Sequence, residues 1–383
     1  MTIKIIVYFL ILSVLYLESL SDCECQESIT SVSGRYSPKR KICSGDLIFE
    51  ENFDLLRLDI WKHEQTLGGG SGNNQFQWYT NNRSNTYVED GILHIRPTLL
   101  ADERGEDFLY NGTIDINGDK PTDSCTNSRY DGCVRTGTKD IILNPIKSAR
   151  MHTAESFAFK FGKVEARAKA PIGDWLWPAI WMMPRWNKYS SWPASGEIDI
   201  MESRGNRQFF KNKINIGVEQ VSSTLHWGPN ANYNRYNYTT FQKNDDNPNG
   251  WHQDFHRYQL EWRPENISFL IDDEYVGTVT PPEGGFWELG QLNATGLENP
   301  WKHGTKMAPF DDEFYFILNV AIGGTSFFSD MAENKPNHKP WKNFDGRASM
   351  TEFWKAKEQW LPTWDVKSDD SHMQVDYIKV TAL

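Results

Sequence analysis

Residues Trp192–Ser203 read WPASGEIDIMES and carry three carboxylates within six positions, Glu197, Asp199 and Glu202. In an extended strand, successive side chains point to opposite faces, so Glu197 and Asp199 share one face. Strict alternation would place Glu202 on the other face, which the isoleucines direct toward the interior, and a buried, unpaired carboxylate is costly. A β-bulge at Ile200–Met201 would return Glu202 to the acidic face. We therefore predict a bulged strand that presents three aligned acids.

Aligned carboxylates of this kind suit glycoside hydrolysis. A retaining glycosidase needs a nucleophile and an acid/base whose carboxyl groups lie about 5–5.5 Å apart. The repulsion between like charges raises one pKa, which keeps that group protonated near neutral pH. Our hypothesis makes Glu197 the nucleophile and Glu202 the acid/base, with Asp199 hydrogen-bonded to the nucleophile. The alternative is an acidic edge strand whose charges face water and oppose aggregation.

The longer string WPASGEIDIMESRGN resembles the active-site strand of glycoside hydrolase family 16, in its laminarinase-like branch. That branch has the pattern Glu-x-Asp-x-x-Glu, whereas mixed-linkage glucanases lack the residue that Met201 supplies here. The resemblance extends over roughly 45–383 and includes SARMHT around Arg150, FGKVEARAKAP, WPAIWMMP, LHWG, FILNVAIGG and MQVDYIKV. It implies a curved, concanavalin A-like jelly-roll sandwich of two antiparallel sheets, with the acidic strand lining an open cleft.

The same resemblance implies residues that would hold a sugar chain. Aromatic side chains would stack on pyranose rings and polar side chains would bind hydroxyls: Trp177, Trp181, Trp192, His226, Arg150 and Asn81. Core packing is the alternative for the tryptophans, and a satisfied structural histidine is the alternative for His226. One position departs from the family, because Gln75 stands where a Glu is common; Gln keeps the hydrogen bonds but loses the charge.

The family also implies a structural calcium ion, although the chemistry itself would need no cofactor. Asp376 matches the family aspartate in the last strand, and Gly91 and Glu51 lie near the other ligand positions. Oxygen ligands suit calcium. An ordinary exposed strand aspartate is the alternative for Asp376.

Two functions follow from the resemblance. The first is an endo-β-1,3-glucanase (laminarinase) that hydrolyses β-1,3-glucan by double displacement with retention. The alternative is a non-catalytic β-1,3-glucan recognition protein of innate immunity. We expect the enzyme, because all three acids are present and because only a short stretch precedes Leu47, where the recognition proteins usually carry an additional glucan-binding module.

Composition agrees with an extracellular carbohydrate-active protein. The net charge of −11 argues against a nucleic-acid partner, and no segment has the roughly 20 apolar residues that span a membrane. Sixteen tryptophans serve either a large core or a surface that stacks on sugars. We expect a monomer whose partner is β-1,3-glucan.

Several features predict secretion. Residues 1–21 have the charge, apolar run and small-residue cleavage site of a signal peptide. Cys125 and Cys133 are expected to form a disulfide, and Cys43 could pair with Cys23 or Cys25. Five Asn-x-Ser/Thr sequons are candidate glycosylation sites, at Asn82, Asn111, Asn237, Asn266 and Asn293.

The remaining pattern predicts one all-β domain over 46–383, preceded by an irregular tail at 22–45. Strands are expected at 47–49, 76–80, 87–95 with an Asp-Gly hairpin turn, 156–170, 175–183, 223–227, 255–262, 267–279, 314–322 and 373–380. Residues 101–145 and 228–250 are expected to be long loops. A single short helix is predicted at Met350–Leu361, where Ser349 and Glu352 would form a capping box and Pro362 follows.

Overall fold

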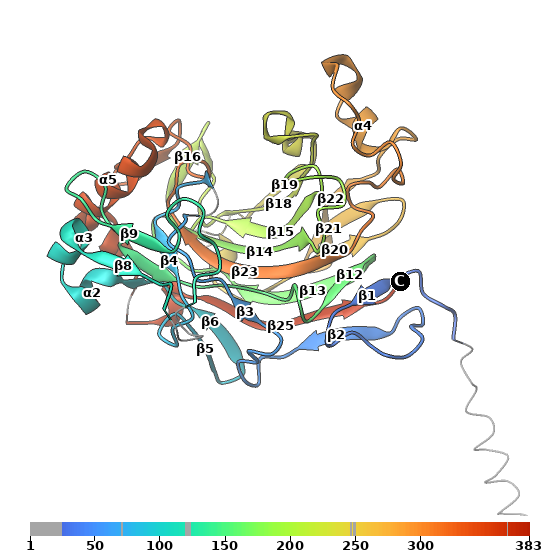
Figure 1. The fold of residues 1–383 in the computed structure, drawn as a ribbon, viewed down its shortest axis with the longest axis horizontal. Coiled ribbons are helices and arrows are strands. Elements are labelled where there is room, and N and C mark those ends of the chain that lie inside the picture. The colour runs from blue at the N-terminus through green and yellow to red at the C-terminus, as the bar shows by residue number, and fades with distance from the viewer. Residues whose placement is uncertain (1–24, 70–71, 119–123, 246, 248–249, 366) are drawn as a thin grey trace, which may run out of the picture.

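The computed structural model describes residues 25–69, 72–118, 124–245, 247, 250–365 and 367–383, and these residues form two large antiparallel sheets (Figure 1). The first sheet has nine strands: in spatial order β1 (Ser31–Ser33), β12 (Ala158–Lys160), β23 (Phe314–Ile322), β14 (Leu176–Pro184), β15 (Glu197–Ser203), β18 (Gln220–His226) and β19 (Thr240–Asn244), with β11 (Arg150–His152) on β23 and β3 (Lys62–His63) on β11. The predicted all-β jelly-roll sandwich is confirmed.

The second sheet has eight strands: β22 (Glu274–Val279), β21 (Ile267–Ile271), β20 (His256–Trp262), β13 (Gly162–Lys169), β25 (Met373–Thr381), β6 (Ile92–Ile95) and β5 (Thr86–Glu89), with β2 (Leu47–Glu51) on β25. Aromatic side chains from both sheets meet between them. Phe49 of β2, for example, stacks on Phe157 with ring centroids 4.4 Å apart and approaches Phe316 of β23 at 6.1 Å.

Strand β14 lies at the centre of the first sheet, between β23 and β15. Seven of its nine residues are buried, which explains the continuous apolar run in its sequence. The acidic strand β15 is therefore supported on one side by a rigid central strand. Its other neighbour, β18, also contributes to the acidic face.

The predicted bulge is present in β15. Ile180 of β14 pairs with Met201, but the next residue, Trp181, pairs with Asp199, so Ile200 is the additional residue. The register between β15 and β18 shifts at the same place, between Asp199 and Glu202. Ser223 bridges the irregularity by donating its hydroxyl to the Ile200 carbonyl at 2.8 Å.

The helical content differs from the expectation of one short helix. The predicted helix at Met350–Leu361 is divided at Ala356 into α5 (Ser349–Lys355) and α6 (Lys357–Trp360). The capping box does not form, because Ser349 is already inside α5 and donates its hydroxyl to the Lys342 carbonyl. Other short helices are α2 (Leu100–Arg104), α3 (Asp107–Asn111) and α4 (Gly285–Leu289).

The segments expected to be irregular are partly ordered. The loop at 101–145 contains α3 and the hairpin of β8 (Thr113–Asp115) with β9 (Val134–Thr136), and the loop at 228–250 contains β19. The expected tail at 22–45 contributes β1, which pairs with β12. β1 pairs with a segment remote in sequence, whereas β8–β9 and β18–β19 pair within or next to these loops, and local periodicity indicates none of these pairings.

Two disulfides lie within these segments. The predicted bond between Cys125 and Cys133 is present, and Cys25 is the partner of Cys43. Cys23 and the predicted signal peptide at 1–21 lie outside the described residues. Among the residues that are described, none belongs to a helix of sufficient length and hydrophobicity to cross a membrane.

The sequon asparagines lie at the surface of the described structure. Asn82, Asn111, Asn237 and Asn293 are exposed, and Asn266 is half-buried. Glycosylation at these asparagines remains a prediction.

Candidate functional site

Glu197, Asp199 and Glu202 lie on one face of β15. Asp199 pairs with Trp181 and Glu202 pairs with Ala179, two positions of β14 that alternate onto the same face. Glu197 pairs with His226 at the end of β18. One ring nitrogen of His226 and one carboxylate oxygen each of Glu197 and Asp199 all lie within 4.8 Å of one another. We call this surface of β14, β15 and β18 the acidic face.

A different donor holds each of the outer acids. The indole Nε1 of Trp192 donates to Glu197 Oε2 at 2.7 Å, and Nε1 of Trp177 donates to Glu202 Oε1 at 2.9 Å. Between them, Asp199 Oδ2 lies 3.3 Å from Nε2 of His226, which is also 3.9 Å from Glu197 Oε1. These contacts orient the carboxylates and leave an exposed flank at Trp192, whose side chain is 40% exposed.

The acids perturb one another electrostatically. Burial raises the pKa of Asp199 well above its ordinary value, and the charges of Glu197 and Glu202 raise it further. Burial also raises the pKa of Glu202, against the opposing effects of His226 and the Trp177 hydrogen bond. The trio therefore carries less than its full negative charge near neutral pH, and Glu202 is suited to donate a proton.

His226 is held by residues of the segment expected to be a loop. Burial lowers its pKa, but Glu197 and Asp199 outweigh that effect and raise it to about 9. Asn234 Nδ2 lies 2.7 Å from His226 Nδ1, while Asn234 Oδ1 accepts from two backbone amides. In the neutral imidazole this network makes Nδ1 an acceptor and leaves the proton on Nε2, which faces Asp199. Tyr236 stacks on the imidazole at 5.2 Å.

The predicted sugar-binding tryptophans have unequal access to solvent. Trp192 is exposed and its ring lies 5.8 Å from that of His226. Trp177 is only 9% exposed and stacks on Phe327 with centroids 4.1 Å apart. Trp181 is half-buried, and its Nε1 donates to Asn319. Core packing therefore accounts for most of the Trp177 side chain, while Trp192 is available for stacking.

Arg150 lies next to Trp181, with its guanidinium 4.6 Å from the indole centroid, and its Nε is 3.0 Å from Glu64 Oε1. The side-chain oxygen of Asn81 accepts from Arg83, and no hydrogen bond within the described part of the chain connects Asn81 to the acids. The structure thus brings Arg150 to the border of the acidic face but does not bring Asn81 there by any contact.

The sequence analysis missed Asn234, Tyr236, Phe327, Asn319 and Glu64. Asn319 had a usable signal, because a polar residue within the apolar run of β23 suggests a hydrogen-bonded role. The others lie outside periodic strand segments, so hydrophobic patterning could not identify them.

Gln75 is buried and its side-chain oxygen accepts from Gln77 Nε2 at 2.9 Å. Gln77 in turn accepts from the backbone amide of Ile322 at the end of β23. A glutamate at position 75 would place a charge in this buried chain, so the neutral amide fits the local structure.

Calcium binding at Asp376, Gly91 and Glu51 stays a prediction, and the carboxylates of Asp376 and Glu51 have other partners in the structure. The Asp376 carboxylate pairs with Arg167 Nη1 at 2.6 Å, so a cation already occupies its coordinating side. The Glu51 carboxylate accepts from the Phe53 amide and the Trp61 indole.

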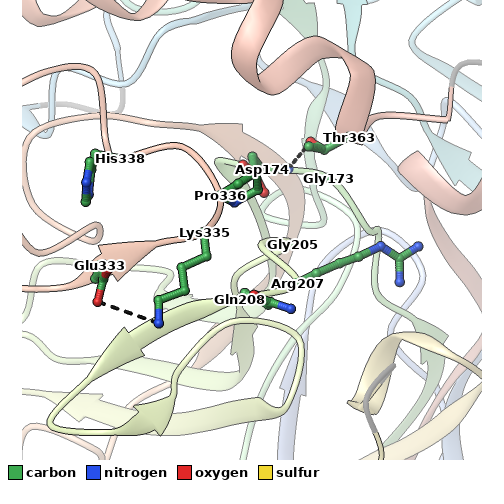
Figure 2. Close-up of a pocket in the computed structure, with 10 residues that line it drawn as sticks. All are labelled: Gly173, Asp174, Gly205, Arg207, Gln208, Glu333, Lys335, Pro336, His338 and Thr363. Atoms are coloured by element: carbon green, nitrogen blue, oxygen red, sulfur yellow. Dashed lines mark hydrogen bonds and ion pairs between the residues drawn. The ribbon is translucent and has the colours of Figure 1, made fainter.

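A polar pocket of about 600 Å³ lies beyond the end of β15, and none of the three acids lines it. Figure 2 shows the lining residues, among them Asp174, Gly205, Lys335 and Thr363. Asp174 is 5% exposed, its Oδ2 accepts from Asn334 at 2.7 Å, and burial raises its pKa to about 6.

We expect Asp174→Asn to change the free energy of unfolding more favourably at pH 7.5 than at pH 4. Because the folded-state pKa of about 6 exceeds the ordinary 3.8, the stabilising contribution of this carboxyl is complete below pH 3.8 and is lost as the pH rises through 6. The shift in the pKa of Asp174 corresponds to about 3 kcal/mol at most in the free energy of unfolding. Urea unfolding at pH 4 and pH 7.5 measures it, with exposed Asp102→Asn as control; an equal effect of Asp174→Asn at both pH values would contradict the argument.

Known proteins of similar sequence belong to one family and its relatives. The profile of "Glycosyl hydrolases family 16" matches residues 121–288. The chain is 47% identical to a beta-1,3-glucan-binding protein of Penaeus monodon, over 87% of this chain and 89% of that protein. It is 35% identical to beta-1,3-glucan-binding protein 1 of Galleria mellonella, over 94% of this chain and 67% of that protein.

Solved structures share the fold at lower identity. The laminarinase from Rhodothermus marinus superposes with a TM-score of 0.53 at 23% identity, covering 88% of this chain and 98% of that one. The endo-beta-1,3-glucanase from Pyrococcus furiosus gives a TM-score of 0.53 at 22% identity, with coverage of 88% and 95%.

Proposed function

Since this chain belongs to glycosyl hydrolase family 16, we propose that it is a β-1,3-glucan-binding protein that recognises its polysaccharide on the acidic face. The observation that carries the proposal is the exposed indole of Trp192 beside His226 and Glu197. A flat aromatic surface next to hydrogen-bonding groups matches a pyranose ring, which has apolar faces and a polar edge. The glucan-binding relatives support the choice of β-1,3-glucan.

The proposed setting is extracellular. Two disulfides are present in the described residues, and such bonds persist in oxidising compartments. The predicted signal peptide and sequons agree with secretion.

Hydrolysis of the bound glucan is the second candidate, and the alignment of three acids on one face favours it. Glu197 would attack the anomeric carbon while Glu202 protonates the departing glycosidic oxygen. Glu202 would then take a proton from water, which attacks the glycosyl-enzyme and releases Glu197. Asp199 and His226 would orient the Glu197 carboxylate and influence its protonation. Recognition alone needs none of these steps.

Trp192→Ala is expected to weaken binding to laminarin by about tenfold or more, since an exposed aromatic anchor that is lost from a binding surface costs at least 1.4 kcal/mol. Isothermal titration with soluble laminarin measures the change. Tyr275→Ala, which removes a 65% exposed aromatic from β22 in the second sheet, is the matched control.

The recognition proposal fails if the wild-type protein does not bind laminarin. Unchanged affinity in Trp192→Ala would move the binding surface away from the acidic face. Both outcomes are independent of whether the glucan is cleaved.

A further inference from the structure

A second cluster of metal-ligand side chains lies on the second sheet, remote in sequence from the acidic face. His94 is in β6, His372 immediately precedes β25, and Asp369 begins the short 3-10 helix η9 (Asp369–Ser371). Strands β6 and β25 are neighbours in the sheet (Figure 1). Both imidazoles are buried, whereas the Asp369 side chain is about half exposed.

The polar atoms of this cluster converge on one point. The two Nδ1 atoms lie 3.4 Å apart, and Asp369 Oδ1 lies 3.2 Å from Nδ1 of His372. Asp369 Oδ2 lies 4.0 Å from Nδ1 of His94. Zinc bonds of about 2.0–2.2 Å at tetrahedral angles place neighbouring ligand atoms about 3.3 Å apart. The separation between the two Nδ1 atoms and that between His372 Nδ1 and Asp369 Oδ1 match this value, and one ligand atom from each of the three residues lies within 4.8 Å of the other two.

We propose that His94, His372 and Asp369 bind a divalent transition-metal ion, zinc in the first instance, at a site that fastens the segment before β25 to β6. Imidazole with carboxylate suits zinc better than calcium or magnesium, which prefer oxygen ligands alone. The exposed side of Asp369 leaves the fourth position to water.

A hydrogen-bonded histidine pair accounts less well for these contacts. Two facing Nδ1 atoms can share only one proton, and 3.4 Å is long for such a bond. The other ring nitrogen of His372 is buried without a hydrogen-bond partner in the described structure. Every polar contact found for that ring, including one with the Tyr87 hydroxyl at 3.4 Å, is therefore on the side of the proposed ion.

The surroundings prepare both rings as ligands. The Tyr87 ring stacks on His94 with an interplanar angle of 2° and centroids 4.9 Å apart, which fixes its orientation. The same Tyr87 ring meets the His372 ring edge-on, with centroids 6.3 Å apart.

The test is zinc titration of the chelator-treated full protein, followed by calorimetry and thermal unfolding. The wild type is expected to bind zinc at this cluster and to unfold at a higher temperature with zinc than without it. His372→Gln should weaken the binding at least about 100-fold, since losing a ligand costs more than losing its supporting hydrogen bond. His303→Gln, at an exposed histidine, should change neither quantity.

Asp369→Asn provides a second variant at a more exposed position, and it should lower the zinc affinity even if His372→Gln does not fold. Glu197→Gln separates this site from the acidic face, where Glu197, Asp199 and His226 form another potential ligand set. The proposal is overturned if the wild type binds no zinc, or if Asp369→Asn retains the full zinc-dependent rise in unfolding temperature. It is also overturned if only Glu197→Gln removes the zinc binding.

Discussion

Trp341→Ala is expected to lower the free energy of unfolding by about 3–5 kcal/mol, the usual cost of truncating a buried tryptophan. Trp341 is 1% exposed and contacts Phe76, Trp175 and Phe353 with centroids 4.9–5.9 Å apart. It thereby connects α5 to the residue that precedes β14. Its indole also donates to the Gly324 carbonyl just beyond β23, at 2.9 Å.

Urea unfolding followed by far-UV circular dichroism measures this loss without relying on tryptophan fluorescence. Trp341→Phe should cost less than Trp341→Ala, because part of the ring contact survives although the hydrogen bond and some of the packed volume are lost. Trp186→Ala, at a tryptophan that is 63% exposed, should change stability by no more than about 0.5 kcal/mol. If Trp341→Ala and Trp186→Ala were equally stable, the aromatic cluster would not be a principal source of stability.

The tryptophan content illustrates what composition alone leaves open. Core packing and sugar stacking both call for large aromatic side chains, so composition alone assigns neither use to an individual tryptophan. In the structure, most of the tryptophans are buried, and Trp192 is the exposed one that contacts the acids. The distinction depends on tertiary packing, to which residues far apart in the chain contribute.

The acidic strand was predictable because two strong constraints coincide within a few residues. Side-chain alternation would bury Glu202, and a bulge avoids the free-energy cost of that burial. The register shift at Ile200 confirms the bulge. The apolar run at 314–322 predicted β23 and the alternation at 373–380 predicted β25 closely. These strands pack one or both faces against the core, where the hydrophobic pattern is strongest.

Prediction was weaker where order comes from long-range contacts. Asn234 and Tyr236 hold His226, yet they belong to a segment of short turns without periodicity. The helix break at Ala356 lies in a stretch with good helical propensity, and the tertiary environment overrides that preference. Residue type suggested the acids, but their supporting side chains required the folded chain.

Glu197→Gln is expected to abolish any release of reducing ends from laminarin while leaving the dissociation constant within about threefold of the wild-type value. An amide cannot act as the carboxylate nucleophile, so the rate should fall by at least about 1000-fold, as for nucleophile replacements in other covalent mechanisms. The Gln oxygen can still accept the Trp192 hydrogen bond of 2.7 Å, so the binding surface should persist.

Reducing-end assays and laminarin titration on the same preparations separate cleavage from recognition. Glu261→Gln is the matched control, because Glu261 lies in β20 of the second sheet and pairs with Lys163 at 3.3 Å. If the wild-type protein binds laminarin but releases no reducing ends, hydrolysis is rejected and recognition stands alone. Undiminished cleavage in Glu197→Gln would instead remove Glu197 from the nucleophile role.

Glu197→Ala provides the sharper test of the covalent step, since it leaves space for a small external nucleophile. Azide in that space should attack the anomeric carbon from the face that Glu197 occupied, restoring cleavage and giving a glycosyl azide of inverted configuration. The same addition should not produce that anomer in Glu202→Ala, where the nucleophile is intact and the missing group is the acid/base. If azide gave the inverted glycosyl azide in Glu202→Ala and not in Glu197→Ala, the roles of the two glutamates would be exchanged. Both would still lie on the acidic face that the bulge in β15 creates.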